Sequence, residues 1–448
     1  MVHRLCMFGL AVMILSGCST YGRIENQPLT AAAPEQAYTM RGPGRRPDND
    51  DVKLYLAFSG GGSRAAALAY GVLQELRDTT AVFDGRSRRL LDEIDAISSV
   101  SGGSFTSAYY GLYGDQIFDD FEDVFLRRDV QGHLINALFN PLQWFSSNGR
   151  TELAVKYYEE QVFHGATFAD LHKSGGPLVL INASDLSYGV RFSFVQEYFN
   201  LLCSDIASFP VARAVTASSA VPVLFNPVVV EDYQDCKNDT PDWLTAAEQA
   251  QQGSPQMIEV INGLKSYFKK SDLRYSHFVD GGITDNLGLR ALYEIIELAG
   301  GARAFSLGLG KSRSRSLVVV SVNAATNPDR EMDRSNRSPS IKETIGAVSS
   351  IQLRRYNADT LQLLDDKLKD WAHELSTPDR PVDVYFIKLS FSEIGQPETL
   401  RFFNLIPTSF DLSDEQVDKL ISAGRKLLRN NPDFQRFLAA HGGKAAVN

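Results

Sequence analysis

Residues 52–71 read VKLYLAFSGGGSRAAALAYG, a short apolar run followed by three glycines and an alanine-rich stretch. The apolar run is typical of a buried β-strand, and residues 63–76 have the composition of a helix. Gly60, Gly61 and Gly62 therefore lie where a strand turns into a helix. Residues without a Cβ allow a sharp turn there and direct backbone N–H groups at an anion, beside the positive end of the helix dipole. A phosphate loop is the alternative, but the spacing is not G-x-G-x-x-G and no Gly-Lys-Ser/Thr follows.

A second strand, turn and helix follow along the chain. Residues 91–100 have the pattern of a strand, Ser101 stands at the turn, and residues 104–111 have helical composition. A serine on such a turn exposes its Oγ, and Gly102 and Gly103 keep the neighbouring backbone from crowding it. The arrangement indicates a nucleophile elbow; the alternative is an ordinary serine-rich loop.

A nucleophilic serine requires a base, and the best-placed candidate is Asp280. It ends the short strand-like run at residues 278–280 and is followed by Gly281 and Gly282. Desolvation raises the pKa of a carboxylate toward the range useful for proton transfer, so Asp280 is expected to act alone. His133, His164 and His172 follow Ser101 in the sequence without a recognisable motif. An Asp-Gly turn is the alternative.

Together these motifs resemble the patatin-like phospholipase family, which combines D-G-G-G-x-R-G, G-x-S-x-G and D-G-G/A and uses a Ser-Asp dyad without histidine. The corresponding segments here are SGGGSRA at 59–65, SVSGG at 99–103, DGG at 280–282 and PVARAVTASSAVPVLF at 210–225. The resemblance covers about residues 52–300. It implies an α/β fold, a three-layer sandwich with a mainly parallel central sheet flanked by helices.

The resemblance also implies an activity and a set of site residues. Ser101 would be the nucleophile, Asp280 the base, the backbone of Gly60, Gly61 and Gly62 the oxyanion hole, and Arg64 the support of that loop. The implied reaction is hydrolysis of lipid carboxyl esters through an acyl-enzyme, of phospholipase A or lysophospholipase type. The substrate would be a membrane lipid or lysolipid. No metal or other cofactor is implied.

Three positions depart from the family pattern. Ser59 replaces an aspartate, Ala65 a glycine and Ser99 the first glycine of the elbow. These departures keep a second hypothesis open, a catalytically weak or inactive envelope lipoprotein that binds lipid or serves as a scaffold. A histidine-dependent α/β-hydrolase is a third, for which no later acid and histidine are evident.

The N-terminus has the pattern of a processed segment. A basic start precedes an apolar run too short to span a membrane, and residues 15–18, LSGC, resemble a bacterial lipobox. This predicts a signal peptide at residues 1–17, a lipid on Cys18, and a flexible tether over residues 18–51. The protein would then be anchored in the bacterial cell envelope, at the outer membrane facing the periplasm. An ordinary secretory signal with a chance cysteine is the alternative.

The remaining sequence predicts one large catalytic unit. Residues 52–322 form the predicted catalytic domain, with an insertion near 231–273 that is either a lid or a surface excursion, and residues 323–448 a C-terminal extension packed on it. A helix is expected over 341–375, a strand over 382–390 and a second helix over 412–428.

Composition and cysteine content add two further expectations. The 44% hydrophobic content suffices for a core, and the net charge of −9 argues against nucleic-acid binding. Cys203 and Cys236 form either a disulfide or two buried thiols.

Overall fold

The computed structural model describes residues 21–29, 37–40, 51–130, 132, 149–222, 224–233, 236, 241–250, 254–267, 274–308, 314–327 and 335–445. The central feature is an eight-stranded sheet in the order β12-β11-β2-β5-β6-β10-β9, with β7 also paired to β6. Its strands are β2 (Val52–Phe58), β5 (Ile94–Val100), β6 (Leu178–Asp185), β7 (Arg191–Ser193), β9 (Val228–Glu231), β10 (Tyr275–Asp280), β11 (Ser316–Asn323) and β12 (Asp383–Ser390). The five strands from β12 to β6 run parallel, and β7, β9 and β10 are antiparallel to their neighbours.

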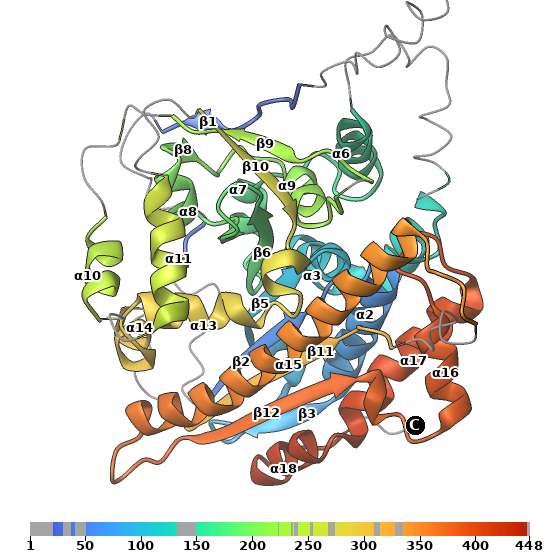
Figure 1. Cartoon of the computed structure of the whole chain (residues 1–448). Coiled ribbons are helices and arrows are strands. Elements are labelled where there is room, and N and C mark those ends of the chain that lie inside the picture. The colour runs from blue at the N-terminus through green and yellow to red at the C-terminus, as the bar shows by residue number, and fades with distance from the viewer. Residues whose placement is uncertain are drawn as a thin grey trace, which may run out of the picture.

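Helices cover both faces of this sheet, as its apolar strands require. In Figure 1 the long helix α15 lies in front of the strands, and α2 and α3 lie behind them. The bounds of these layers are α2 (Ser63–Asp78), α3 (Gly102–Tyr113), α13 (Leu289–Leu298), α15 (Ile341–Leu375) and α17 (Asp414–Asn430). The predicted three-layer α/β sandwich with a mainly parallel sheet is confirmed.

The other α-helices and strands surround this framework. They are β1 (Gln27–Pro28), β3 (Thr80–Phe83), β4 (Arg86–Arg89), α4 (Ile117–Phe121), α6 (Arg150–Gln161), α7 (Phe168–Lys173), α8 (Gln196–Leu201), β8 (Ser204–Asp205), α9 (Val211–Ser218), α10 (Asp242–Ala250), α11 (Pro255–Ser266), α12 (Gly282–Asp285), α14 (Ala302–Gly308), α16 (Pro397–Leu405) and α18 (Pro432–Ala440).

The C-terminal extension is built into the catalytic unit. Its strand β12 pairs in parallel with β11 and ends the sheet. Its helix α17 packs on α2 so closely that a Cβ at Gly71 would lie 2.2 Å from the Ile421 carbonyl oxygen. Glu75 of α2 is fully buried and accepts two hydrogen bonds from Arg429 of α17, at 2.7 and 2.8 Å.

Part of the predicted tether packs on the protein body. We call residues 21–29 the N-terminal strap. Within it, β1 pairs with β8, Asn26 is buried, and the Glu25 carboxylate forms a 2.6 Å ion pair with the buried Arg213. Tyr38 is also buried, and its hydroxyl donates to the Val179 carbonyl at 2.9 Å. The prediction of a flexible tether is therefore wrong for residues 21–29 and 37–40, because long-range polar contacts and strand pairing hold them.

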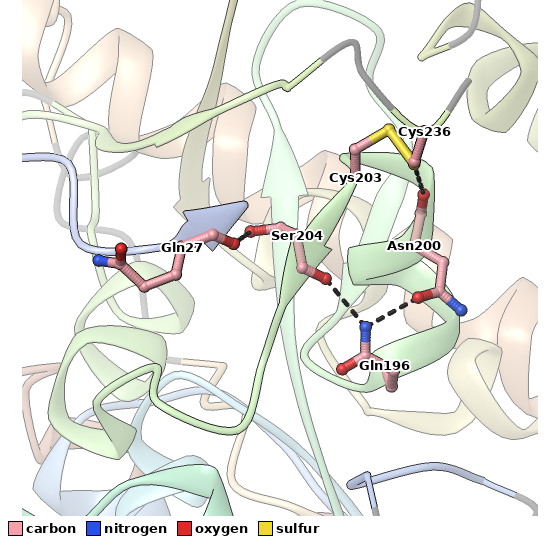
Figure 2. Close-up of a disulfide and its surroundings, with 6 residues drawn as sticks. All are labelled: Gln27, Gln196, Asn200, Cys203, Ser204 and Cys236. Atoms are coloured by element: carbon pink, nitrogen blue, oxygen red, sulfur yellow. Dashed lines mark hydrogen bonds between the residues drawn. A yellow bond between two sulfur atoms is a disulfide. The ribbon is translucent and has the colours of Figure 1, made fainter. Parts of the chain in front are cut away.

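A disulfide between Cys203 and Cys236 ties the start of the insertion to the turn between α8 and β8. Figure 2 shows this bridge beside Ser204, whose hydroxyl donates to the Gln27 carbonyl of the strap at 2.9 Å. Farther along the insertion, α11 buries Met257, Ile261 and Leu264. The described part of the insertion is thus packed on the body.

The predicted signal segment and Cys18 lie outside the described residues. Within the part that the structure describes, every helix is too short or too polar to cross a membrane.

Candidate active site

Ser101 stands at the turn between β5 and α3, as expected. Its backbone has φ 51° and ψ −123°, a conformation rarely adopted by residues with side chains, and its side chain is only 4% exposed. Its N–H donates to Ser218 Oγ at 2.8 Å. A Cβ at Gly102 would lie 2.0 Å from the Gly62 carbonyl oxygen, and one at Gly103 would lie 2.7 Å from Phe58 Cβ. The strand-turn-helix layout therefore requires glycine after the serine.

Asp280 lies beside this serine at the end of β10 and is 8% exposed. Its carboxylate accepts a hydrogen bond from the Gly282 N–H at 2.8 Å, and the Ser101 side chain lies close enough to influence its pKa. Burial raises the pKa of Asp280 to about 6, against the lowering effects of the Gly282 N–H and the Ser101 side chain. The structure thus brings the predicted nucleophile and the predicted base together.

The Asp280 turn is fixed by the same segment that holds the serine. The Asp280 N–H donates to the Ala220 carbonyl and the Gly281 N–H to the Ser218 carbonyl, both at 3.0 Å. Ser218 therefore holds both turns: its hydroxyl accepts from the Ser101 N–H, and its carbonyl accepts from the N–H of Gly281, which follows Asp280. It lies in the 210–225 segment that the family resemblance had singled out, although its role was not predicted.

The three loop glycines are not equivalent. The Gly60 N–H donates to the Asn286 carbonyl at 2.9 Å, so it is not available to an oxyanion, contrary to its predicted role. Gly61 and Gly62 have φ of 140° and 62°, and within the described part of the chain no acceptor binds their N–H groups. The loop lies against the serine, because a Cβ at Gly60 would be 3.3 Å from Ser101 Cβ. Gly61 and Gly62 are therefore the available donors of this loop.

Asn286 is a site residue that sequence reasoning missed. Its side-chain oxygen would lie 2.9 Å from a Cβ at Gly60 and 3.3 Å from one at Gly282. The residue is buried and stands between the glycine loop and the Asp280 turn. Only its position shortly after Asp280 could have indicated this, because its contacts involve segments distant in sequence.

Arg64 links the glycine loop to the C-terminal extension. Its guanidinium is buried and donates to the Ala324 carbonyl at 2.9 Å, the Ile406 carbonyl at 2.6 Å and the Thr408 hydroxyl at 3.0 Å. Burial lowers the pKa of Arg64 to about 10. Because Ile406 and Thr408 belong to the C-terminal extension, that extension helps to hold the loop, as does a 2.9 Å hydrogen bond from the Ser63 N–H to the Ser409 carbonyl.

The three departures from the family pattern are accommodated without strain. The Ser59 hydroxyl accepts a 2.9 Å hydrogen bond from the Ala324 N–H. Ser99 lies within β5 at negative φ, and its hydroxyl donates to the Leu180 carbonyl at 3.2 Å. Ala65 is buried next to the loop. These contacts remove the structural reason for expecting a degenerate site.

No described histidine hydrogen-bonds to Ser101 or Asp280; His133 lies outside the described residues. In the described ranges, no three or more His, Cys, Asp or Glu side chains are grouped so as to hold a metal ion.

Comparison with known proteins agrees with this geometry. The chain matches the family model described as patatin-like phospholipase over residues 56–293. A search of curated proteins finds no match.

Among solved structures, the chain is similar to human GIVD cytosolic phospholipase A2, with 14% identity, a TM-score of 0.44, and coverage of 94% of this chain and 66% of that one. The complex of the same enzyme with methyl γ-linolenyl fluorophosphonate and terbium chloride gives 12% identity, a TM-score of 0.40 and the same coverage. The chain thus spans slightly less than two thirds of those proteins.

Proposed function

The chain belongs to the patatin-like phospholipase family, and on that premise we propose that it is a serine acyl hydrolase of membrane lipids. Family membership supports lipid ester hydrolysis in general. The finer proposal is a phospholipase A or lysophospholipase activity carried by Ser101 and Asp280. It rests on one observation, the position of the buried Asp280 carboxylate, whose pKa burial raises to about 6, beside the elbow serine Ser101.

The contacts support a two-step reaction. Above pH 6 the Asp280 carboxylate is ionised and accepts the Ser101 proton as Oγ forms a bond to the ester carbonyl carbon. The N–H groups of Gly61 and Gly62 would bind the resulting oxyanion, an interaction worth about 10²-fold or more in rate. The proton then passes to the leaving alcohol as the ester bond breaks. Water attacks the acyl-enzyme by the same route and releases the fatty acid.

Labelling with a fluorophosphonate tests this assignment. We expect wild-type protein to be labelled and Ser101→Ala to be unlabelled. Ser99→Ala is the matched control, since its hydroxyl faces the Leu180 carbonyl of β6. Labelling that survives Ser101→Ala, or that is lost in Ser99→Ala alone, would contradict the proposal.

We also propose that the protein is a bacterial lipoprotein anchored through Cys18 in the cell envelope, at the outer membrane facing the periplasm. The support is the lipobox-like LSGC at residues 15–18. A lipid on the cysteine would bring the enzyme to its substrate, and stable anchoring requires more than one acyl chain. Cys18→Ser should move the protein out of the membrane fraction and abolish the mass added by lipidation. Wild-type protein without lipid at Cys18 would refute the anchor while leaving the hydrolase proposal intact.

A further inference from the structure

Large apolar side chains are exposed on the segments that hold the active site. Ile283 lies just after the Asp280 turn, and Leu224 lies in the same 210–225 segment as Ser218. Leu405 immediately precedes Ile406, whose carbonyl accepts a hydrogen bond from Arg64. Each of these three apolar side chains is more than half exposed. Monomeric proteins rarely leave large apolar patches uncovered without a binding role.

The start of α15 adds two more apolar side chains beside the site. The Tyr356 hydroxyl donates to the Thr284 carbonyl at 2.8 Å, which fixes α15 on α12. After that contact the helix packs into the core, where Thr360 and Leu364 are buried. Before it, none of the described side chains in residues 343–355 is buried. At 1.5 Å per residue, residues 343–355 extend about 20 Å along the helix. Val348 and Ile351 are exposed on this part, one helical turn apart.

The N-terminal strap begins on the same side of the protein. A Cβ at Gly22 would lie 2.3 Å from Val229 Cγ2 of β9, the strand that follows Leu224 closely. Cys18 is four residues before Gly22, and so short a chain reaches at most about 14 Å. A lipid on Cys18 would therefore hold this side of the body close to the bilayer, since the strap itself is fixed.

We propose that these five residues, Leu224, Ile283, Val348, Ile351 and Leu405, form a mouth face that docks on a lipid bilayer. The proposal deepens the proposed function and rests on it. Apolar side chains gain free energy when they leave water for the acyl boundary of a bilayer. A lipid surface is favoured over a protein partner because arginines border these residues and because the strap that follows Cys18 packs on this side of the body.

Charges near the mouth face suit an anionic lipid surface. Arg150 is exposed, and its guanidinium donates to the Leu224 carbonyl at 3.4 Å. On α15, Arg355 is exposed and Arg354 binds the Asn327 side chain at 2.6 Å. Basic side chains at the edge of an apolar patch add attraction to anionic headgroups.

Vesicle binding tests the docking separately from the lipid anchor. The parent is the full chain carrying Cys18→Ser, mixed with vesicles of phosphatidylcholine and phosphatidylglycerol. Val348→Ser with Ile351→Ser in that parent should lower vesicle binding by about tenfold or more, given the apolar surface removed. The matched control is Leu307→Ser: Leu307 is 63% exposed, close to the 65% of Leu405, but lies on α14, which contacts the far end of α15 through Glu374.

The readouts distinguish docking from chemistry. Hydrolysis of a soluble short-chain ester should be unchanged in the double variant, since neither residue touches the dyad, while hydrolysis of vesicle lipid should fall with binding. Docking is refuted if the double variant binds vesicles like its parent, or if Leu307→Ser loses as much binding. If vesicle binding depends on Val348 and Ile351 but no ester is hydrolysed, docking holds and the proposed hydrolase fails.

Discussion

Replacing Asp280 by asparagine should abolish hydrolysis and at the same time stabilise the fold near neutral pH. Burial raises the pKa of this carboxyl from 3.8 to about 6. An acid whose pKa rises on folding binds its proton more tightly in the folded state, so ionising it above pH 6 lowers the free energy of unfolding. A shift of about two units corresponds to about 3 kcal/mol. Asparagine has nearly the same shape without the charge, so Asp280→Asn should gain up to about 3 kcal/mol at pH 8.

This gain should depend on pH in a defined direction. It should decrease as pH falls through 6 and be lost below the ordinary pKa of 3.8, where the wild-type carboxyl becomes protonated in the unfolded state as well. Urea unfolding at pH 8 and pH 4 measures it. Ser101→Ala is the control, because it is also expected to be inactive but keeps the carboxylate and removes a side chain that lowers its pKa. An Asp280→Asn effect of the same size at both pH values would refute the reasoning.

Three other outcomes are expected. The kcat/KM for a soluble ester should rise with pH around an apparent pKa of about 6, since only ionised Asp280 accepts the proton; a flat profile from pH 5 to pH 8 would contradict this. Gly102→Ala should abolish fluorophosphonate labelling because its Cβ would lie 2.0 Å from the loop carbonyl, whereas Gly395→Ala, with nothing within 4 Å, should be labelled normally. Glu75→Gln should lower the urea-derived free energy of unfolding by about 3 kcal/mol by leaving its α17 arginine without a buried carboxylate; a loss under about 1 kcal/mol would count against that role.

Local patterns account for what the sequence predicted well. The strand at Val52–Phe58 and the helix at Ile341–Leu375 have the predicted bounds, because neither run contains proline and each has a clear boundary signal, the glycines that closely follow Phe58 and the capping box of Ser340. Leu412–Leu428 was expected as a helix and α17 begins at Asp414, after the capping box of Ser413. The site motifs are also local, because each is a strand followed by a turn with two or three glycines.

Contacts between distant segments account for what was missed. Glu25 and Arg213 form an ion pair across 188 residues of sequence. The sequence of the strap alone therefore contains no signal that it packs on the body. The Gly60 N–H is bound by a carbonyl far along the chain, so its loss as an oxyanion donor could not be read from the glycine triplet. The pairing of Cys203 with Cys236 likewise depends on where the insertion begins in space.

The segment that holds the glycine loop has a consequence for when activity can arise during synthesis. The carbonyls of Ile406 and Ser409 bind Arg64 and the Ser63 N–H, and Ile406 follows Arg64 by 342 residues in the sequence. A nascent chain can already contain Ser101 and Asp280 yet lack the C-terminal contacts that shape the glycine loop at residues 60–62. This implies that the proposed hydrolysis begins only after residues 406–409 have been synthesised and have folded against the glycine loop.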